Sequence, residues 1–231
     1  MRLDRMLSNA HAGTRSQVKK LVKEKRVKVN GVLAKTSSMQ IDEVNDEVTL
    51  DGIPVIYEEH MYLMLHKPAG YISATEGNVP TVMDLIYEDN NGLFPCGRLD
   101  KDTEGLLLIT NDGPLAHTLL SPKHHVEKEY YVEHALDMSE DDIVRLQSGI
   151  SYNGETYKPA KVNMISPRSC TLTITEGKYH EIKFMFQALG DKVTYLKRLR
   201  MKNLVLDGSL KPGEYRYLTE EEIADLKADE Q

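Results

Sequence analysis

Apolar residues in the first part of the chain recur at the spacing of short helices. One set lies at positions 3–7 and another at positions 18–22, and within each set the spacing of three and four residues places the apolar side chains on one helical face. Thr14 and Gln17 stand three residues apart just before the second set, which is the spacing of a capping box. We therefore predict two short amphipathic helices, the second beginning after Thr14.

A small sheet is predicted to follow these helices. The segments VKV at 27–29 and VLA at 32–34 flank Asn30-Gly31, a pair that tolerates the positive φ angles of a tight hairpin turn. The segment EVTL at 47–50 supplies a third strand. Residues 1–58 are thus expected to form a compact α/β module of their own.

The pattern changes beyond a short connection at 53–60, and residues 59–231 are predicted to form a second, larger domain. Its apolar strand-like segments lie at 62–65, 106–110, 130–133, 160–165 and 170–175, and its helical patterns at 114–120, 139–147 and 180–189. An acidic segment at 219–230 suits a final helix. Strands and helices do not alternate regularly, which favours an α+β fold with a mixed or largely antiparallel sheet.

Charge is divided unevenly between the two parts. Residues 1–36 contain ten Lys and Arg against two acidic residues, a balance of +8, whereas the whole chain carries −7. The rest of the chain therefore carries −15. Such asymmetry points to a basic module that binds a polyanion, attached to an acidic body, although a run of charge can also be only a solvated face.

The basic residues lie among the apolar positions of the first module, so they would gather on one face. In RLDRML at 2–7, TRSQVKKLVKEKRVKVNG at 14–31 and DEVTLDG at 46–52, the segment resembles the S4 RNA-binding domain. The resemblance implies that this face binds RNA phosphates. The residues expected to do so are Arg2, Arg5, Arg15, Lys19, Lys20, Lys23, Arg26 and Lys28.

The densest motif of the larger domain is GRLDKDTEGLLLITNDG at 97–113. Polar residues and glycines directly precede the apolar run LLLI, which places Asp100 on a loop that enters a core strand. A rigid strand can hold such a loop so that a carboxylate stays accessible. The alternatives are that Asp100, Asp102 and Thr103 only cap local backbone amides, or that Asp102 is the reactive acid.

This motif resembles the central motif of the pseudouridine synthases that modify small-subunit (16S) ribosomal RNA. Further segments agree in order: LMLHKPAGYISAT at 63–75, SPKHHVEKEYYV at 121–132, TEGKYHEIKFMF at 175–186 and LKPGEYRYLTEEEI at 210–223. The resemblance implies an enzyme that isomerises one uridine of 16S rRNA, by family uridine-516, to pseudouridine. It also implies that residues 59–231 form the catalytic domain.

The same resemblance implies the roles of three residues. Asp100, the acid of the RLD triplet, corresponds to the family's catalytic aspartate, and Lys183 to the cation that pairs with it. Tyr130 corresponds to the aromatic residue beside the target base. A carboxylate can attack the sugar or the base, or remove a sugar proton, and an adjacent cation favours its charged form. The alternatives are a solvated Lys183 and a Tyr130 that only packs in the core.

Two further contacts with RNA are expected in the catalytic domain. An enzyme that acts on a base within folded RNA must extrude it from the stack, and Arg98 could stack on or bond to that nucleotide; a structural ion pair is the alternative. The segment KRLRMK follows a strand-like VTYL, so its four cations are expected to meet backbone phosphates near the cleft. These are Lys197, Arg198, Arg200 and Lys202.

The sequence indicates neither a cofactor nor a metal. The two cysteines, Cys96 and Cys170, are far apart and lack a CxxC pattern, and no carboxylate or cysteine is spaced to complete a metal site with His124-His125. No apolar run reaches the ~18 residues of a membrane span. We expect a cytoplasmic monomer that acts on 16S rRNA, in a pre-ribosomal particle.

Two positions depart from the family pattern. Phe184 stands where a second basic residue is usual, and RMKN at 200–203 stands where Arg-Ile-Gly is usual. Both departures concern RNA contacts or packing near the cleft. Two other functions stay open: an enzyme that modifies large-subunit rRNA, and a non-catalytic RNA-binding protein of the ribosome.

Overall fold

The computed structural model describes residues 1–10, 12–55, 57, 60–88 and 92–228. The chain divides into two compact units, Met1–His60 and Met61–Gln231. The boundary predicted near residue 58 lies outside the described residues. Within the described ranges, every helix is too short or too polar to cross a membrane.

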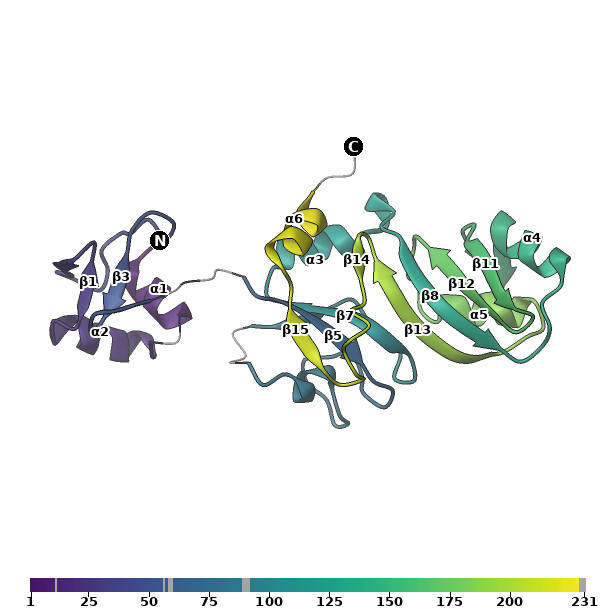
Figure 1. Cartoon of the computed structure of the whole chain (residues 1–231), viewed down its shortest axis with the longest axis horizontal. Helices are drawn as coiled ribbons and strands as arrows, with labels where there is room; N and C mark the ends of the chain where they lie inside the picture. Colours follow the sequence, from purple (N-terminus) through teal and green to yellow (C-terminus); the bar gives the residue numbers. More distant parts are fainter. Residues whose placement is uncertain (11, 56, 58–59, 89–91, 229–231) are drawn as a thin grey trace. The chain divides into compact units, whose positions relative to one another are not determined.

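The first unit contains the predicted pair of helices and the predicted hairpin (Figure 1). The Thr14 side chain accepts a hydrogen bond from the Gln17 backbone amide, and the Gln17 side-chain oxygen accepts one from the Thr14 backbone amide, which confirms the capping box. A four-stranded antiparallel sheet runs in the order β2-β1-β3-β4. The elements are α1 Leu3–Asn9, α2 Arg15–Lys23, β1 Val27–Val29, β2 Val32–Leu33, β3 Val48–Leu50 and β4 Ile53–Pro54.

The second unit is built on a nine-stranded mixed sheet, which confirms the α+β expectation. Its main path runs in the order β11-β12-β8-β13-β7-β5-β15, and β6 and β14 pair with β7 and β13 at the side of this path. The strands are β5 Tyr62–Lys67, β6 Phe94–Cys96, β7 Glu104–Thr110, β8 Lys128–His134, β11 Lys161–Ser166, β12 Ser169–Ile174, β13 Val193–Met201, β14 Leu204–Val205 and β15 Tyr215–Tyr217.

Helices and a hairpin accompany this sheet (Figure 1). The helical elements are η1 Val82–Leu85, α3 Gly113–Leu120, η2 Pro122–His124, α4 Glu140–Ser148, α5 Glu181–Ala188 and α6 Glu220–Lys227, and the hairpin consists of β9 Ile150–Tyr152 and β10 Glu155–Tyr157. The predicted helices at 114–120, 139–147, 180–189 and in the acidic tail are confirmed. The hairpin was not predicted.

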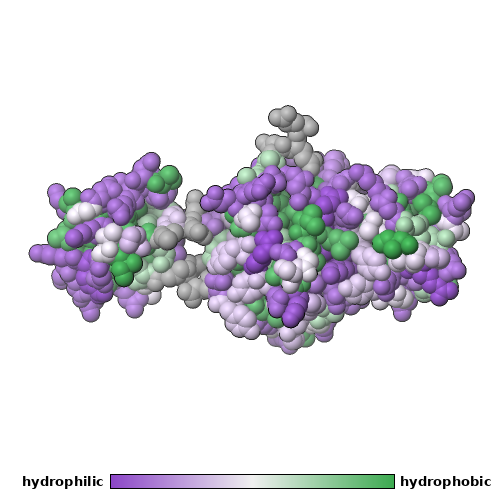
Figure 2. Space-filling view, viewed as in Figure 1, coloured by the Kyte–Doolittle hydropathy of each residue, from purple (hydrophilic) through white to green (hydrophobic). Residues whose placement is uncertain are grey.

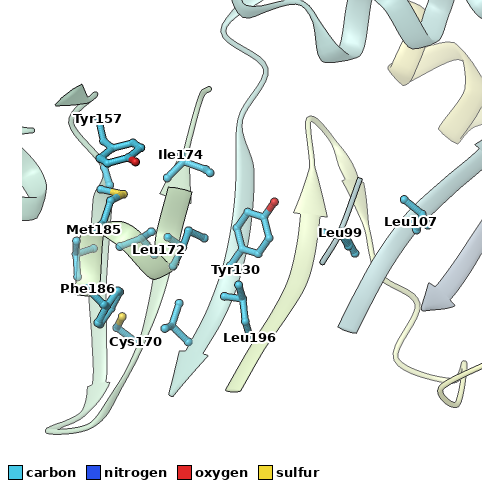
Figure 3. Packing of buried hydrophobic residues seen from close by; sticks show 14 of the residues in the cluster. Leu99, Leu107, Tyr130, Tyr157, Cys170, Leu172, Ile174, Met185, Phe186 and Leu196 are labelled. Atoms are coloured by element: carbon cyan, nitrogen blue, oxygen red, sulfur yellow. The ribbon is translucent and has the colours of Figure 1, made fainter. Parts of the chain in front are cut away.

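Both faces of the central strands are buried, which explains the unbroken apolar run LLLI. In β7, Leu107 and Ile109 belong to one core cluster, and Leu106 and Leu108 belong to the other. The first cluster also contains residues of α5, and the second contains residues of α3 and α6. Figure 3 shows part of the first cluster, with Tyr130 on β8 beside Leu196 on β13.

The strands β7 and β13 form the one parallel pairing among the described strands, and only two residue pairs carry it. Lys197 pairs with Glu104, and Arg198 pairs with Gly105. Gly105 has φ +104°, and a Cβ atom built there would lie 2.2 Å from the Arg198 carbonyl oxygen. Only glycine therefore allows the two backbones to approach so closely.

We predict that Gly105→Ala strongly destabilises the second unit. The substitution combines an unfavourable φ, which costs about 1–3 kcal/mol, with overpacking, which costs about 1–3 kcal/mol more. Urea unfolding followed by circular dichroism measures the change. The control is Gly208→Ala, because that glycine has open space around its Cβ position and no positive φ; equal stability of the two variants would contradict the role of the close approach.

Candidate active site

The loop between β6 and β7 places Asp100 at the edge of a pocket, and Lys67 binds the backbone of this loop. The Lys67 ammonium, fully buried at the end of β5, donates to four backbone carbonyls. The distances from its Nζ to the carbonyl oxygens are 3.1 Å for Pro68, 3.0 Å for Asp100, 3.4 Å for Lys101 and 2.7 Å for Thr103. The loop conformation therefore depends on one buried cation.

A serine fixes the residue before Asp100. The Ser73 hydroxyl donates to the Leu99 carbonyl at 2.9 Å and accepts from the Leu99 amide at 3.0 Å. Leu99 is itself buried in the core. With Leu99 held by both its backbone groups and its side chain, the direction in which Asp100 leaves the core is set.

Asp100 and Lys183 form an ion pair, as the resemblance implied. The Lys183 Nζ lies 2.8 Å from Asp100 Oδ2 and 2.7 Å from Asp102 Oδ1, so it bridges the two acids. His180 Nε2 lies 3.4 Å from the other Asp100 oxygen. Lys183 thus binds carboxylates and is not a solvated helix-face lysine.

The bridge also sets the protonation of the cation. Partial burial lowers the pKa of Lys183, but its hydrogen bonds to Asp100 and Asp102 outweigh this effect and raise the pKa above its ordinary value. Partial burial raises the pKa of Asp102, but the hydrogen bond from Lys183 and the attraction of the Lys183 charge are among the effects that together lower it by more, so the net shift is downward. Both effects favour a charged pair at neutral pH.

The two acids differ in their surroundings. The side chain of Asp100 is 26% exposed and that of Asp102 is 73% exposed. Asp100 lines the pocket, whereas Asp102 does not. The geometry therefore favours Asp100 as the acid that meets a bound molecule.

The pocket beside Asp100 has space for a small ring, with about 410 Å³ that includes its opening to solvent. Its lining combines apolar and charged side chains: Arg98, Leu99, Asp100, Thr103, Tyr130, Ile174, Gly177, Lys178, His180, Glu181, Ile182, Lys183 and Leu196. Asp100, Tyr130 and Lys183, which were predicted from three separate segments, are thus brought together. Arg98 is exposed at the same pocket.

Tyr130 lines the pocket although almost all of it is buried. Burial raises the pKa of Tyr130, and the neighbouring Arg198 guanidinium opposes this rise. Its neighbour Tyr131 points to the other side of the strand and bonds to Glu133 at 2.9 Å. Tyr130 is therefore both a core residue and a pocket residue, with a neutral hydroxyl at neutral pH.

The predicted phosphate-binding patch at 197–202 needs correction. The strand β13 continues to Met201, and its burial pattern places Leu196, Arg198 and Met201 in the core. Arg198 is 2% exposed and donates to the Leu106 carbonyl at 2.7 Å. Lys202 is 8% exposed, and its ammonium donates to the carbonyls of Leu226 and Ala228. Neither cation is presented to phosphates.

The other two members of that patch lie nearer the surface. Arg200 is partly exposed and is paired with Glu127 at 3.1 Å and Glu129 at 3.0 Å. Lys197 is partly exposed on the same strand. The Arg200 guanidinium is therefore already paired with two carboxylates.

The cations of the first unit remain accessible. The eight residues predicted to bind phosphates are all exposed: Arg2, Arg5, Arg15, Lys19, Lys20, Lys23, Arg26 and Lys28. Arg2 pairs with Asp4 at 2.6 Å and Arg26 with Asp51 at 2.6 Å. Hydrophilic residues dominate the visible face of this unit in Figure 2.

Other candidates carry no site. His124 and His125 are exposed next to η2. Within the described ranges no group of three His, Cys, Asp or Glu residues is placed to hold a metal ion. Cys96 and Cys170 are free and buried, and burial raises the pKa of each thiol to about 11.

Sequence reasoning missed three residues that build the site. Lys67 lies within the segment LMLHKPAG, where its apolar neighbours indicate a core strand and give no sign of a buried cation. His180 contacts Asp100. Glu181 is buried and accepts hydrogen bonds at 2.7 Å from the amides of Gly177 and Lys178, which fixes the loop before α5.

Comparisons with known proteins agree with the two units. The model of the family described as RNA pseudouridylate synthase matches residues 61–188, and the model of the S4 domain matches residues 1–48. The two matches fall on different units. Each unit is therefore similar to a separate known family.

The similarity to individual relatives extends over the full length. The chain is 49% identical to an uncharacterized RNA pseudouridine synthase of Bacillus subtilis, over 96% of this chain and 97% of the relative. It is 41% identical to ribosomal small subunit pseudouridine synthase A of Haemophilus influenzae, over 98% and 99%. A crystal structure of a pseudouridylate synthase matches with a TM-score of 0.70 and 40% identity, covering 98% of this chain and 99% of that one.

We predict that Lys67→Met lowers the free energy of unfolding at pH 7. Each carbonyl that loses its donor away from water costs about 1–3 kcal/mol. The loss should be visible in a urea titration. Lys211→Met, which removes an exposed lysine, is the control and should leave the midpoint unchanged.

The pH dependence of this loss has a definite sign. Burial lowers the pKa of Lys67 from its ordinary 10.5 to about 8 in the folded protein. Between about pH 8 and 10.5 the unfolded chain holds a proton that the folded chain has released, so Lys67 makes stability rise with pH in this window. The Met variant lacks this rise, and a stability difference that stays constant from pH 8 to 10 would contradict the buried charge.

Proposed function

Because the chain belongs to the RNA pseudouridylate synthase family, we propose that it isomerises one uridine of small-subunit rRNA with Asp100 as the catalytic carboxylate. Its similarity to a ribosomal small subunit pseudouridine synthase A supports this substrate. The segments that resemble the 16S type support uridine-516 as the target. Action on rRNA would take place in the cytoplasm, and the chain would act as a monomer.

One observation carries the proposal. The Asp100 carboxylate lies at the pocket edge, 2.8 Å from the Lys183 ammonium, with Tyr130 lining the same pocket. This arrangement supplies a negative oxygen, a compensating cation and an aromatic ring in one place. A uracil ring extruded from RNA would need these groups.

The reaction breaks the bond between ribose C1′ and uracil N1 and forms a bond between C1′ and uracil C5. The proton leaves C5 and N1 gains a proton, so the atoms balance without any other reactant. Asp100 would begin the reaction at the nucleoside, as nucleophile or base. Lys183 would hold the carboxylate in position and offset its charge. Tyr130 would lie against the base, where its neutral hydroxyl can take part in moving the proton from carbon 5.

Arg98 would assist the extrusion of the base. It is exposed at the pocket and stands two residues before Asp100. A planar guanidinium can stack on or bond to an extruded nucleotide. The first unit, Met1–His60, which matches the S4 domain and is called the S4 unit below, would supply most of the phosphate contacts. The substrate would be 16S rRNA in a pre-ribosomal particle.

We predict that Asp100→Asn abolishes pseudouridine formation and leaves RNA affinity nearly unchanged, because it removes one charge while keeping the shape. Asp102→Asn is the matched control: it also removes a carboxylate bound to Lys183, but one outside the pocket. The measurement is the mapping of pseudouridines in rRNA from cells that lack the protein and carry either variant. Wild type and Asp102→Asn should restore one site in 16S rRNA, and Asp100→Asn should not.

Other outcomes of this mapping identify other functions. Restoration of a site in 23S rRNA would assign the enzyme to the large subunit. An unchanged pseudouridine map with wild-type protein would support a non-catalytic RNA-binding role. Full activity of Asp100→Asn would refute the assignment of this residue.

A second prediction concerns the S4 unit. In the full chain, Lys19→Gln combined with Lys23→Gln should weaken binding to a 16S rRNA transcript and flatten the slope of log affinity against log salt by about 0.7–0.9 for each lost phosphate contact. Filter binding at several salt concentrations gives this slope. Lys211→Gln, which removes an exposed lysine of the second unit, should leave the slope unchanged.

A further inference from the structure

A second cavity lies beside the candidate active site, and most of its lining is aromatic. It is lined by Tyr152, Asn153, Glu155, Tyr157, Lys178, Tyr179 and Phe184 and holds about 840 Å³, including space open to solvent. These residues come from the β9–β10 hairpin, from α5 and from the loop before it. We call the cavity the aromatic cavity.

Part of this aromatic surface has a structural role. The rings of Tyr152 and Phe184 stack with centroids 5.7 Å apart and planes at 28°, which joins the hairpin to α5. Tyr157 is buried in the core. These rings line the cavity, and the stack of Tyr152 on Phe184 holds the hairpin against α5.

Tyr179 has no such role. It is 72% exposed, although it is a large aromatic residue. Its ring stacks on His180 with centroids 3.8 Å apart and planes at 18°, and it meets Phe184 edge-on at 6.3 Å. With one face against His180 and most of the residue in solvent, Tyr179 offers a flat surface for a further ring.

The aromatic cavity adjoins the candidate active site. Lys178 lines both cavities. His180, on which Tyr179 stacks, is the residue that contacts Asp100 at 3.4 Å. Two stacked rings, those of His180 and Tyr179, therefore lie between the Asp100 carboxylate and the exposed face of Tyr179.

The charges of the aromatic cavity do not suit a phosphate. The Lys178 ammonium is already paired with Glu155 at 2.8 Å and Glu176 at 3.7 Å. Glu155 itself lines the cavity. The chemistry available is therefore ring stacking, with the Asn153 amide as a hydrogen-bonding group.

We propose that the aromatic cavity binds an unpaired nucleobase of the substrate RNA, next to the target uridine, by stacking on Tyr179. The inference rests on the proposed function, because an RNA whose uridine enters the Asp100 pocket must continue across the adjoining surface. Stacking of an unpaired base on an aromatic ring is a general mode of RNA recognition. Phe184, which departs from the family pattern, contacts the Tyr179 ring edge-on. It makes this cavity aromatic, whereas the basic residue that is usual at this position would make it basic.

The test measures binding and turnover of an unmodified 16S rRNA transcript by the full-length Tyr179→Ala and Tyr179→Phe variants. Removal of one base stack costs about 1–3 kcal/mol, so Tyr179→Ala should raise Kd and KM on the order of 5- to 150-fold. Tyr179→Phe keeps the ring and should stay within about twofold of wild type. The salt slope should be unchanged in both, because no phosphate contact is lost.

Tyr87→Ala is the matched control, because Tyr87 is 88% exposed and lines neither cavity. A Tyr179→Ala variant that binds like this control would overturn the proposal. So would equal losses in Tyr179→Ala and Tyr179→Phe, which would indicate a hydroxyl contact such as one to a protein partner.

A second readout locates the base. In a synthetic 16S rRNA fragment, the fluorescent base 2-aminopurine is placed in turn on each side of the mapped uridine. At one of these two positions, wild-type protein should quench its fluorescence and the Tyr179→Ala variant should not. Equal quenching by both proteins at both positions would also overturn the proposal. Binding is measured without turnover, so failure of the proposed function, seen as absent pseudouridine, is distinguishable from failure of the stacking site.

Discussion

The narrow parallel pairing of β7 with β13 is the constraint on which the candidate active site depends. Arg198 pairs with Gly105 on one side and with Tyr130 on the other. One row of residues thus joins the strand that follows the Asp100 loop to the strand that carries Tyr130. A side chain at Gly105 would push the two backbones apart, and with them the acid and the aromatic ring that line one pocket.

Buried cations lie along the same region of the sheet, and they hold its backbone through carbonyl oxygens. Lys67, Lys128 and Arg198 are all buried, and burial lowers the pKa of both Lys67 and Lys128 to about 8. Each donates to a backbone carbonyl: Lys67 to that of Thr103, Lys128 to that of Val126 and Arg198 to that of Leu106. A buried ammonium held in this way fixes loops more rigidly than a surface ion pair, because breaking it leaves an uncompensated charge.

The sequence predicted those features that depend on local periodicity. Thr14 with Gln17 located a helix start, and LLLI located the central strand, because caps and apolar runs act over a few residues. Arg198 and Lys202 were predicted as surface cations, because alternating cations in a strand look the same whether they face water or distant carbonyls. Lys67 was missed because three of its partners, the carbonyls of Asp100, Lys101 and Thr103, are remote in sequence, and backbone acceptors leave no residue-type signal.

The burial of Arg198 and Lys202 separates affinity from chemistry within the protein. Exposed cations give RNA binding its salt dependence, because counterions are released only where phosphates are neutralised. The eight exposed cations proposed to bind phosphates lie in the S4 unit, whereas the pocket contributes one exposed arginine, Arg98, together with paired or buried charges. If these cations bind phosphates as proposed, binding strength would fall with salt through the first unit. The Asp100–Lys183 pair, partly buried and hydrogen-bonded, is screened much less by salt, so the chemical step proposed for it should depend only weakly on ionic strength.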